Sequence, residues 1–424
     1  MSGPGAGPAV RADPGALSQS GGVPSAGRTA AYIDLDALSE NLAAVRGRLG
    51  PGRETLAVVK AEAYGHGAPE AAEAFLRGGA RLLGVATVEE AAALRAFSKE
   101  GPLARASILV MSGAAPAEAP RIAAFDLEAA VWDIAQVEAL SAAARAAGRR
   151  LRLHLKVDSG MGRLGAAPAE AADFLRAAAA MEGIEVAGLM SHLAQAEEEG
   201  GEAPTRAQFE VIRDLAGDLR AKGLLPPLLH CANSAGGLLF PDAPGEIVRA
   251  GIALYGCPPA AAEGVTLRPA MRWRSAVIQV REIAAGAPVG YGGAYRRSTP
   301  GRIAVVSAGY GDGYPRLLSN RGDALVGGRR VPVAGRVSMD MLTLDVSGLD
   351  EVRAGDEAVL LGAQGEERIR AEELADRAET IPYEILCGVG GRVPRVFVRD
   401  GREAGRRTLW SGAPRDPAPG EEGS

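Results

Sequence analysis

The sequence predicts an α/β barrel plus a β domain: an N-terminal (β/α)8 TIM-type barrel followed by a C-terminal mostly-β domain. Between about residue 55 and residue 255, short apolar runs alternate with Ala-rich stretches of helical spacing. There are eight such runs, which favours a closed parallel barrel over an open sheet. After about residue 265 the apolar runs lie closer together and are joined by Gly-rich turns, which indicates a separate β domain.

The expected barrel strands are, in order, TLAVVK, LLGVA, SILVM, FDLEAAV, LRLHLKV, IEVAGLM, PPLLH and EIVRAGIAL. An amphipathic segment, DALSENLAAVRGRL, predicts a helix before the first of them. In the β domain, strands are expected at RWRSAVIQVREI, RIAVVSAGY, ALVGGRRVPVAGRV, MLTLDV and EAVLLG. A short helix at AEELADRAE then precedes a last strand pair around PYEILCGV and RVPRVFVR.

These patterns place the barrel at residues 29–265 and the β domain at residues 266–412. Residues 1–28 and 413–424 are rich in Gly, Pro, Ala and Ser and are expected to be disordered. The N-terminal stretch has no apolar core of the kind found in signal peptides, and no segment has the roughly 20 apolar residues needed to cross a bilayer.

Composition excludes several classes of function. The net charge of −5 comes from 47 basic and 52 acidic residues spread along the chain, so no basic surface for nucleic acid is expected. Cys231, Cys257 and Cys387 are widely spaced and odd in number, which fits neither a disulfide framework nor a zinc site. We therefore expect a cytoplasmic protein without a metal.

A lysine at the end of the first barrel strand is the first sign of chemistry. Lys60 lies in AVVKAEAYGHG, and active sites of such barrels lie at the C-terminal ends of the strands. A desolvated lysine there can form a Schiff base with an aldehyde cofactor. Taken alone, the same lysine could equally be a strand-end side chain that extends to solvent.

The segment LHLKVDSGMGRLG contains the pattern GxGxxG, from Gly160 to Gly165. Asp158 and Ser159 separate the preceding strand from these glycines, so the tight strand-to-helix turn of a dinucleotide site is poorly matched. We do not expect a nicotinamide or flavin site here.

AVVKAEAYGHG resembles the pyridoxal-phosphate lysine motif of the alanine racemase family, with Glu62 where Asp is usual. Further blocks resemble the same family in the same order, over roughly residues 30 to 400. They are LHLKVDSGMGRLG, SHLAQAEE, HCANSAG, VRAGIALYG, VGYGGAY, AGYGDGYPR, AGRVSMDM and PYEILCGVGGRVPR.

The resemblance implies an enzyme that interconverts L-alanine and D-alanine with pyridoxal 5'-phosphate and supplies D-alanine for peptidoglycan. Racemisation needs a base on each face of the substrate α-carbon. Lys60 would serve one face, and Tyr291 of a second subunit would serve the other. A homodimer with two shared sites is therefore expected. A hydrogen bond from His192 would help Tyr291, whose phenol ordinarily has a pKa near 10.

The resemblance also implies a set of cofactor ligands. Arg249 would contact the pyridine nitrogen and keep it unprotonated, which disfavours transamination. Arg163 would contact the cofactor's phenolic oxygen and the substrate carboxylate, oriented by Lys156, which in the family is often carbamylated. The residues implied at the phosphate are Tyr64, Asn233, Ser234, Gly251, Ile252 and Tyr383.

A last group of residues resembles the substrate side of the family's site. Met339 would meet the substrate carboxylate from the partner subunit, and Asp340 adjoins it. Ser338 stands where relatives often have Cys, which predicts altered thiol or inhibitor sensitivity without loss of catalysis. The residues that resemble the family's substrate access path are Glu197, Tyr310, Arg316 and Arg336.

Three alternatives remain open at the level of sequence. A serine or broad-specificity racemase of the same fold would share these motifs. A decarboxylase for basic amino acids would be expected to have an acidic residue at the position of Arg249. A non-catalytic pyridoxal-phosphate carrier would be a barrel alone, and a purely structural barrel would not explain why the four histidines, His66, His154, His192 and His230, all lie in matched blocks.

Overall fold

A computed structural model describes residues 27–408, apart from residues 99, 260, 261 and 263. The chain divides into two compact units, a barrel unit, Leu35–Ala270, and a β unit made of Met1–Asp34 and Met271–Ser424. Nearly all of the predicted disordered ends lies outside the described residues.

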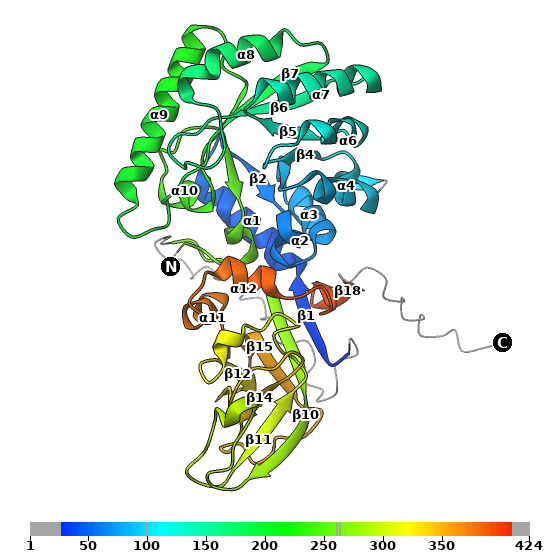
Figure 1. The fold of residues 1–424 in the computed structure, drawn as a ribbon, viewed down its shortest axis with the longest axis vertical. Coiled ribbons are helices and arrows are strands. Elements are labelled where there is room, and N and C mark those ends of the chain that lie inside the picture. The colour runs from blue at the N-terminus through cyan, green and yellow to red at the C-terminus, as the bar shows by residue number, and fades with distance from the viewer. Residues whose placement is uncertain (1–26, 99, 260–261, 263, 409–424) are drawn as a thin grey trace, which may run out of the picture. The chain divides into compact units, whose positions relative to one another are not determined.

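The barrel unit contains a parallel sheet of eight strands within the described residues, in the order β8-β7-β6-β5-β4-β3-β2-β9 (Figure 1). Every strand coincides with one of the eight apolar runs, which confirms the predicted fold class. A hydrogen bond of 3.0 Å from the Arg249 amide to the Ala232 carbonyl connects the two ends of the sheet, so the barrel is nearly closed. The strands are β2 (Glu54–Val58), β3 (Leu82–Val85), β4 (Ser107–Val110), β5 (Glu128–Val131), β6 (Leu151–Lys156), β7 (Ile184–Met190), β8 (Leu228–His230) and β9 (Ile247–Ala250).

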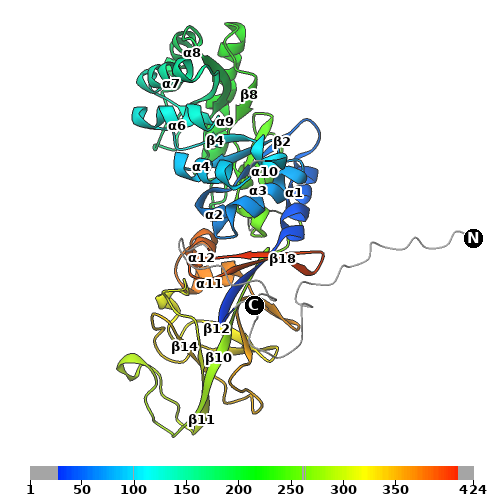
Figure 2. The same cartoon turned by 90° about the vertical axis from the view of Figure 1, so that its right-hand side faces the viewer.

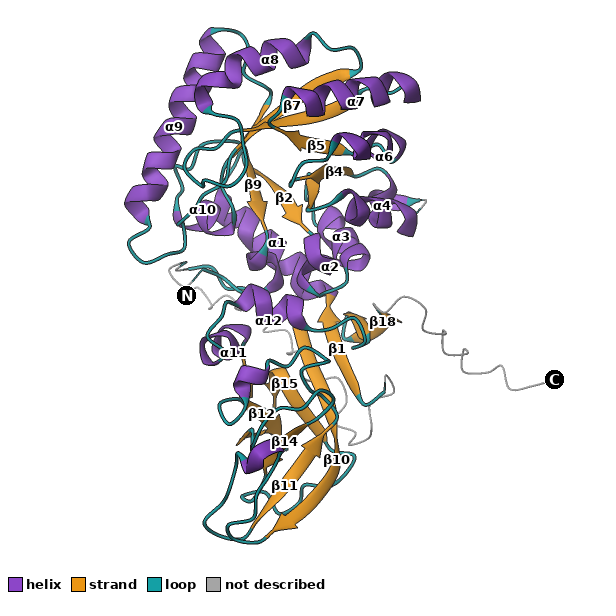
Figure 3. Cartoon of the chain, in the orientation of Figure 1, coloured by secondary structure: helices purple, strands orange, loops and turns teal. Residues whose placement is uncertain are grey.

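Helices surround these strands, and the predicted first helix is present as α1 (Figure 3). Their starts have local causes: the Thr87 and Glu90 side chains form a reciprocal capping box at α4, and the Asp133 side chain caps α7. The helices are α1 (Leu35–Leu49), α2 (Lys60–Tyr64), α3 (Ala68–Arg77), α4 (Val88–Phe97), α5 (Gly101–Ala104), α6 (Ala119–Ala124), α7 (Ile134–Ala147), α8 (Ala171–Ala179), α9 (Glu202–Ala221) and α10 (Ser234–Leu239), with 3-10 turns η2 (Pro116–Glu118), η3 (Pro168–Glu170) and η4 (Ile252–Tyr255).

The barrel core is mostly aliphatic. Leu56, Leu83, Leu109 and Leu153 are fully buried on four different strands, and each contributes about 1.5–3 kcal/mol through burial of its side chain. Several polar side chains are nevertheless buried with them, namely Glu128, His154, Lys156, His230 and Arg249. Burying polar groups costs free energy unless they are hydrogen-bonded.

The β unit is organised around β10, which pairs with β1, β11 and β15. Residues 29–34, which the sequence pattern places in the barrel domain, instead form a strand that pairs antiparallel with β10 and parallel with β17, and so belong to the β unit. Its strands are β1 (Thr29–Asp34), β10 (Met271–Ile283), β11 (Gly301–Val306), β12 (Asp323–Val326), β13 (Arg329–Pro332), β14 (Leu342–Asp345), β15 (Glu357–Gln364), β16 (Glu367–Ile369), β17 (Arg395–Arg399) and β18 (Arg402–Arg407).

Two helices, α11 (Ala371–Arg377) and α12 (Pro382–Gly388), lie side by side in this unit (Figures 1 and 2). The expectation of a strand at PYEILCGV was wrong, because this segment forms α12. Pro382 at the first helical turn and Glu384 near the helix N-terminus favour the helix. The last strand pair is β17 with β18. Short 3-10 turns are η5 (Tyr291–Gly293) and η6 (Arg316–Leu318).

Within the described ranges, none of the helices combines the length and apolar character needed to span a membrane.

Candidate active site

Lys60 stands two residues after the end of β2 and begins a left-handed turn of the backbone. Ala61, Glu62, Ala63 and Tyr64 all have φ between 52° and 54°. Left-handed backbone costs roughly 1–2 kcal/mol for each residue other than glycine, so the surrounding structure must impose it. Strain of this kind concentrates at functional sites, and it fixes the direction in which Lys60 leaves the strand.

Side chains on neighbouring elements hold this turn in place. The Glu90 carboxylate accepts hydrogen bonds of 2.7 Å from the amides of Ala61 and Ala86, and so ties the turn to the start of α4. His66 Nδ1 lies 3.1 and 2.9 Å from the carbonyl oxygens of Ala63 and Tyr64, which requires the proton on Nδ1. Sequence reasoning missed Glu90, although the Thr87-x-x-Glu90 pattern is a capping-box signal.

Tyr255 supports the same turn from the other side. Its ring is buried and lies 4.8 Å from the Tyr64 ring and 4.7 Å from the His66 ring, measured between centroids. Its hydroxyl donates to the Val58 carbonyl over 2.8 Å. The backbone turn that begins at Lys60 is therefore packed against a buried aromatic cluster.

Four further basic residues lie near Lys60 at the C-terminal ends of the strands. Burial is the main cause that lowers the pKa of Lys156 to about 8, and the charges of Arg249, Arg163 and Lys60 lower it further. Burial and the same group of cations lower the pKa of His192 to about 2. The structure thus brings together Lys60, Lys156, Arg163, His192 and Arg249, a donor set suited to a ligand with several negative charges.

Arg249 is buried and held by acceptors only. Its guanidinium donates to the carbonyls of His230 and Ser191, each over 2.6 Å, and to that of Cys231 over 3.1 Å. It also lies 2.9 Å from Nδ1 of His192. Because arginine is always a donor, this nitrogen of His192 must accept, and the imidazole proton is on Nε2. Burial lowers the pKa of Arg249 to about 10, so it remains charged at neutral pH.

The loop after β6 carries Arg163, whose side chain is exposed. One carboxylate organises this loop: Asp158 Oδ1 accepts from the amides of Gly160, Met161 and Gly162 over 2.9, 2.8 and 3.1 Å. Burial works against this charge, but the backbone N–H groups hold the pKa of Asp158 below its usual range. The amides that a dinucleotide phosphate would need are therefore occupied, in agreement with the expectation that GxGxxG is no such site here.

Gln208 on α9 connects two loops of the site and was missed from sequence. Its side chain accepts from the Ala194 amide over 2.9 Å and donates to the His192 carbonyl over 3.0 Å and to Ser159 Oγ over 3.1 Å. Ser159 and Ser191 share a hydrogen bond of 2.7 Å. No local motif marks this glutamine, because its partners come together only in the folded barrel.

The predicted phosphate ligands of the barrel lie close to one another. Ser234 Oγ accepts from the Gly251 amide over 2.9 Å, and Asn233 caps α10 through the Gly236 amide over 2.8 Å. A Cβ placed on Gly251 would lie 2.5 Å from the Tyr64 hydroxyl. A glycine is therefore required for Tyr64 to approach this backbone. The hydroxyls of Tyr64 and Ser234 and the Ile252 amide, with the Gly251 amide orienting Ser234, have the chemistry expected of a phosphate site.

In the β unit, the predicted site residues are exposed on adjoining loops. Tyr291 is 70 % exposed, and a Cβ on the neighbouring Gly292 would lie 3.5 Å from the Arg336 side chain. Tyr310 and Met339 are 42 % and 53 % exposed, and the Tyr310 amide donates to the Ser338 carbonyl over 2.9 Å. Tyr291 thus lies next to the loop of residues 333–341, which carries Met339.

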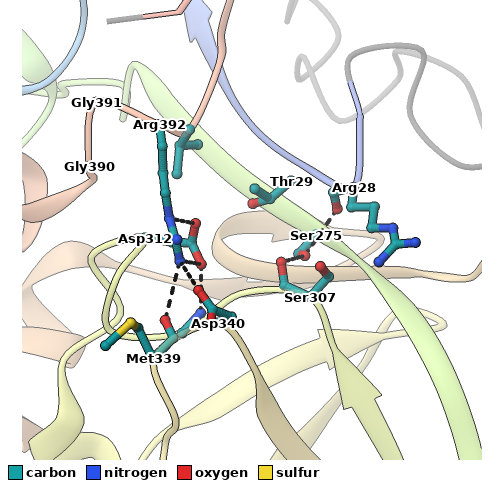
Figure 4. Close-up of polar contacts among 12 residues, drawn as sticks. Arg28, Thr29, Ser275, Ser307, Asp312, Met339, Asp340, Gly390, Gly391 and Arg392 are labelled. Carbon is teal, nitrogen blue, oxygen red and sulfur yellow. Dashed lines mark hydrogen bonds and ion pairs between the residues drawn. The ribbon is translucent and has the colours of Figure 1, made fainter. Parts of the chain in front are cut away.

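Arg392 fixes the loops that carry Tyr310 and Met339, and it too was missed from sequence. Figure 4 shows its guanidinium between Asp312 and Asp340, with Nε 2.8 Å from Asp312 Oδ1 and Nη2 2.8 Å from Asp340 Oδ1. The same Nη2 lies 3.3 Å from the Met339 carbonyl.

Three further predicted residues lie on other segments of the two units. Glu197 is exposed in the loop after β7, Arg316 is exposed at the start of η6, and Tyr383 is half-buried on α12 of the β unit. Two groups of site residues therefore exist, one at the C-terminal ends of the barrel strands and one on the loops of the β unit.

The barrel carries a fixed lysine, a buried arginine and a neutral histidine at its strand ends, and the β unit that follows in sequence carries an exposed tyrosine. These features define the class of pyridoxal-phosphate-dependent racemases. Comparison with known proteins identifies the family. Residues 33–259 match the family model of the alanine racemase N-terminal domain, and residues 270–397 match that of the alanine racemase C-terminal domain. The chain therefore belongs to the alanine racemase family.

Individual relatives agree with this assignment. The chain is 43% identical to the alanine racemase of Symbiobacterium thermophilum, over 87% of this chain and 97% of the relative. It is 42% identical to that of Syntrophobacter fumaroxidans, over 84% and 94%. Two crystal structures are similar over most of both chains: alanine racemase from Streptomyces lavendulae, with a TM-score of 0.81 at 39% identity and 88% and 97% coverage, and alanine racemase from Bacillus anthracis with bound L-Ala-P, with a TM-score of 0.82 at 32% identity and 90% and 97% coverage.

Proposed function

We propose that this protein interconverts L-alanine and D-alanine with pyridoxal 5'-phosphate, by two-base proton transfer. The observation that carries the proposal is the cluster of Lys60, Arg249 and His192 at the strand ends, with His192 kept neutral by burial and by its contact with Arg249. The match of both units to the alanine racemase family models supports the same reaction.

Lys60 is proposed to hold the cofactor covalently. Phosphate would be bound by the hydroxyls of Tyr64, Ser234 and Tyr383 and by the Ile252 amide. The Gly251 amide, which donates to Ser234 Oγ, would orient that hydroxyl, and Asn233 would order α10. When bound, pyridoxal phosphate would withdraw electrons from the amino acid and so acidify its α-hydrogen. The hydroxyls, amides and cations of the barrel fit its phosphate and phenolate charges.

Arg249 is proposed to contact the pyridine nitrogen. The guanidinium does not release a proton near neutral pH, so it would donate a hydrogen bond to the ring nitrogen without protonating it. That favours racemisation over amino-group transfer.

Lys60 Nζ and the Tyr291 hydroxyl are proposed to hold and deliver protons on opposite faces of the substrate α-carbon. His192 would donate from Nε2 to Tyr291 and so stabilise the phenolate that a tyrosine base requires. Since Tyr291 lies in the β unit, we propose that it comes from the second subunit of a homodimer, together with Met339 and its neighbour Asp340.

Arg163 is proposed to bind the substrate carboxylate and the cofactor's phenolic oxygen. Lys156, with its pKa lowered to about 8, would be carbamylated and orient Arg163. Tyr310, Arg336, Arg316 and Glu197 are proposed to line the access path, and their bulk would favour alanine over larger substrates.

We further propose that the enzyme acts in the cytoplasm, where it supplies D-alanine for peptidoglycan. The three widely spaced cysteines of the sequence support a reducing compartment.

The reaction is tested by incubating purified protein with pyridoxal phosphate and L-alanine in D2O, and following deuterium at the α-carbon together with optical inversion. Lys60→Ala should abolish both, and Tyr291→Phe should impair them by about 10²-fold or more. Lys222→Ala, which removes a lysine salt-bridged to Asp218 at the end of α9, is the control. If the wild type binds the cofactor but neither exchanges nor inverts alanine, while serine is inverted, the enzyme is a serine or broad-specificity racemase. Failure with every amino acid would favour a non-catalytic carrier.

A further inference from the structure

A continuous file of polar side chains runs through the barrel interior from Arg249 toward the other end of the strands. Arg249 Nη1 lies 3.5 Å from His230 Nδ1, and His230 Nε2 lies 2.8 Å from His154 Nδ1. His154 Nε2 lies 2.8 Å from one oxygen of Glu128, whose other oxygen accepts from Arg152 over 2.6 Å. Both histidines are fully buried, and the Arg152 side chain, 35% accessible, is the outer end of the file.

The ends of the file determine the direction of every hydrogen bond in it. Arginine only donates, and an ionised carboxylate only accepts. Burial works against charge on Glu128, but its hydrogen bond to His154 and the charge of Arg152 lower its pKa overall. With Glu128 as acceptor, His154 must carry a proton on Nε2.

The same reasoning continues to the active site. If His154 is neutral, its Nδ1 accepts from Nε2 of His230, and Nδ1 of His230 presents a lone pair to Arg249. Protonating His230 on Nδ1 would set one donor against another. Burial is the main cause that keeps the pKa of His230 well below its usual value, and the charge of Arg249 adds to it, which agrees with a neutral His230.

The backbone makes room for the file. A Cβ placed on Gly188 of β7 would lie 2.2 Å from Nδ1 of His154, so a glycine is needed where the two imidazole rings meet. The rings pack edge to face, with centroids 5.0 Å apart and an interplanar angle of 81°. Ordinary aliphatic packing would not require this arrangement, and burying three polar residues costs free energy that a purely structural core would avoid.

We propose that Glu128, His154 and His230 are positioning residues for Arg249. Their hydrogen bonds all run in one direction, so that Nδ1 of His230 accepts from the Arg249 guanidinium. This contact fixes the orientation in which Arg249 donates to the pyridine nitrogen. This rests on the proposed function of Arg249. The carboxylate lies two imidazole rings away from the arginine, so Arg249 keeps its full charge in a buried position. With His192 Nδ1, the guanidinium lies between two neutral imidazoles.

The hydrogen-bond file can be tested without reference to activity. Because the chain has only four histidines, 15N-histidine labelling gives few signals, and single His→Gln variants assign them. In the wild-type protein, with and without pyridoxal phosphate, we expect His154 and His230 to be neutral Nε2–H tautomers. A scalar coupling across the hydrogen bond between His230 Nε2 and His154 Nδ1 should be measurable. An Nδ1–H tautomer at His230, or a charged His154, would overturn the proposal.

The effect on Arg249 is tested with three variants. Glu128→Leu removes the acceptor, Glu128→Gln keeps an acceptor oxygen for His154, and Glu185→Gln is the control. Glu185 pairs with the same arginine, with 3.8 Å between Arg152 Nε and Glu185 Oε1. It is a suitable control because the hydrogen bond of His154 goes to Glu128. The readouts are kcat, KM for alanine, and pyruvate released per alanine racemised, which reports amino-group transfer to the cofactor.

For Glu128→Leu we expect kcat to fall by about tenfold, KM to stay within about twofold, and the pyruvate ratio to rise by about tenfold. Glu128→Gln and Glu185→Gln should keep the wild-type ratio. A purely structural role would lower both reactions by the same factor, so an unchanged ratio in Glu128→Leu contradicts the proposal. If the wild type does not racemise alanine, the proposed function fails, while the nitrogen coupling still reports on the file.

Discussion

The guanidinium of Arg249 donates to Nδ1 of His192 over 2.9 Å, and this one contact links the proposed cofactor ligand to the proposed partner of the catalytic tyrosine. It leaves His192 with a donor at Nε2 and, with burial, keeps the imidazole neutral.

The first prediction concerns pH. Burial and the nearby cations lower the pKa of His192 to about 2, whereas the unfolded chain titrates near pH 6.5. The folded state therefore binds fewer protons, so His192 adds no cost above pH 6.5 and reduces stability as the pH falls below it. The expected slope is up to about 1.4 kcal/mol per pH unit. His192→Gln should flatten the fall of the melting temperature between pH 6.5 and pH 5. An equal fall in variant and wild type would contradict the prediction.

A second prediction concerns Lys156. Carbamylation requires the free amine, and a pKa lowered to about 8 makes a substantial fraction of that form available at pH 8. With 13C-bicarbonate at pH 8, the wild type should show a protein-bound carbamate carbon by NMR, and the signal should weaken as the pH falls below 7. Lys156→Gln should lack it. If the signal survives in Lys156→Gln, the carbamate lies on another amine.

The third prediction concerns the left-handed turn at Lys60. Glu90→Ala removes the acceptor for the amides of Ala61 and Ala86, and should cost about 2–3 kcal/mol of unfolding free energy. It should also weaken attachment of pyridoxal phosphate, followed by its visible absorbance. Glu89→Ala, on the adjacent residue and paired with exposed Arg121, is the control and should leave stability nearly unchanged, because exposed ion pairs contribute little. Equal effects of the two variants would refute a special role for Glu90.

A fourth prediction concerns Arg392 and its two aspartates in the β unit. Without its guanidinium, the loops that carry Tyr310 and Met339 lose their shared anchor. Arg392→Leu should raise KM for alanine by about tenfold, with a smaller effect on kcat, since a substrate contact is displaced while the bases remain. Arg402→Leu, which changes an exposed arginine on β18, is the control. Steady-state kinetics that show only a lower kcat would count against this assignment.

Sequence reasoning captured the parts of the molecule that depend on local pattern. Each apolar run became a barrel strand, because eight segments of the right length and spacing admit few other arrangements. It failed where pairing over long distances decides the structure. The strand at residues 29–34 joins β10 and β17, which lie more than 200 residues further along the chain, and no periodicity reveals that partner.

The supporting residues of the site show the same limit. Lys60, Arg249 and His192 stand in motifs that can be read directly. Gln208 and Arg392 act through partners that come together only on folding. Arg392 lies in the matched block PYEILCGVGGRVPR, but nothing in that block reveals its partners. The segment of α12 contains apolar residues that suit a strand equally well, and only Pro382 and Glu384 indicated a helix start.

The most direct test of the account is complementation between two inactive variants. If each site combines Lys60 of one subunit with Tyr291 of the other, a Lys60→Ala and Tyr291→Phe heterodimer contains one intact site and one doubly altered site. Co-refolding the two variants in equal amounts makes about half of the dimers mixed, so alanine racemisation should recover to about a quarter of the wild-type rate. Recovery to that level supports a shared two-base site, whereas a mixture that forms dimers and stays as inactive as its parents contradicts it.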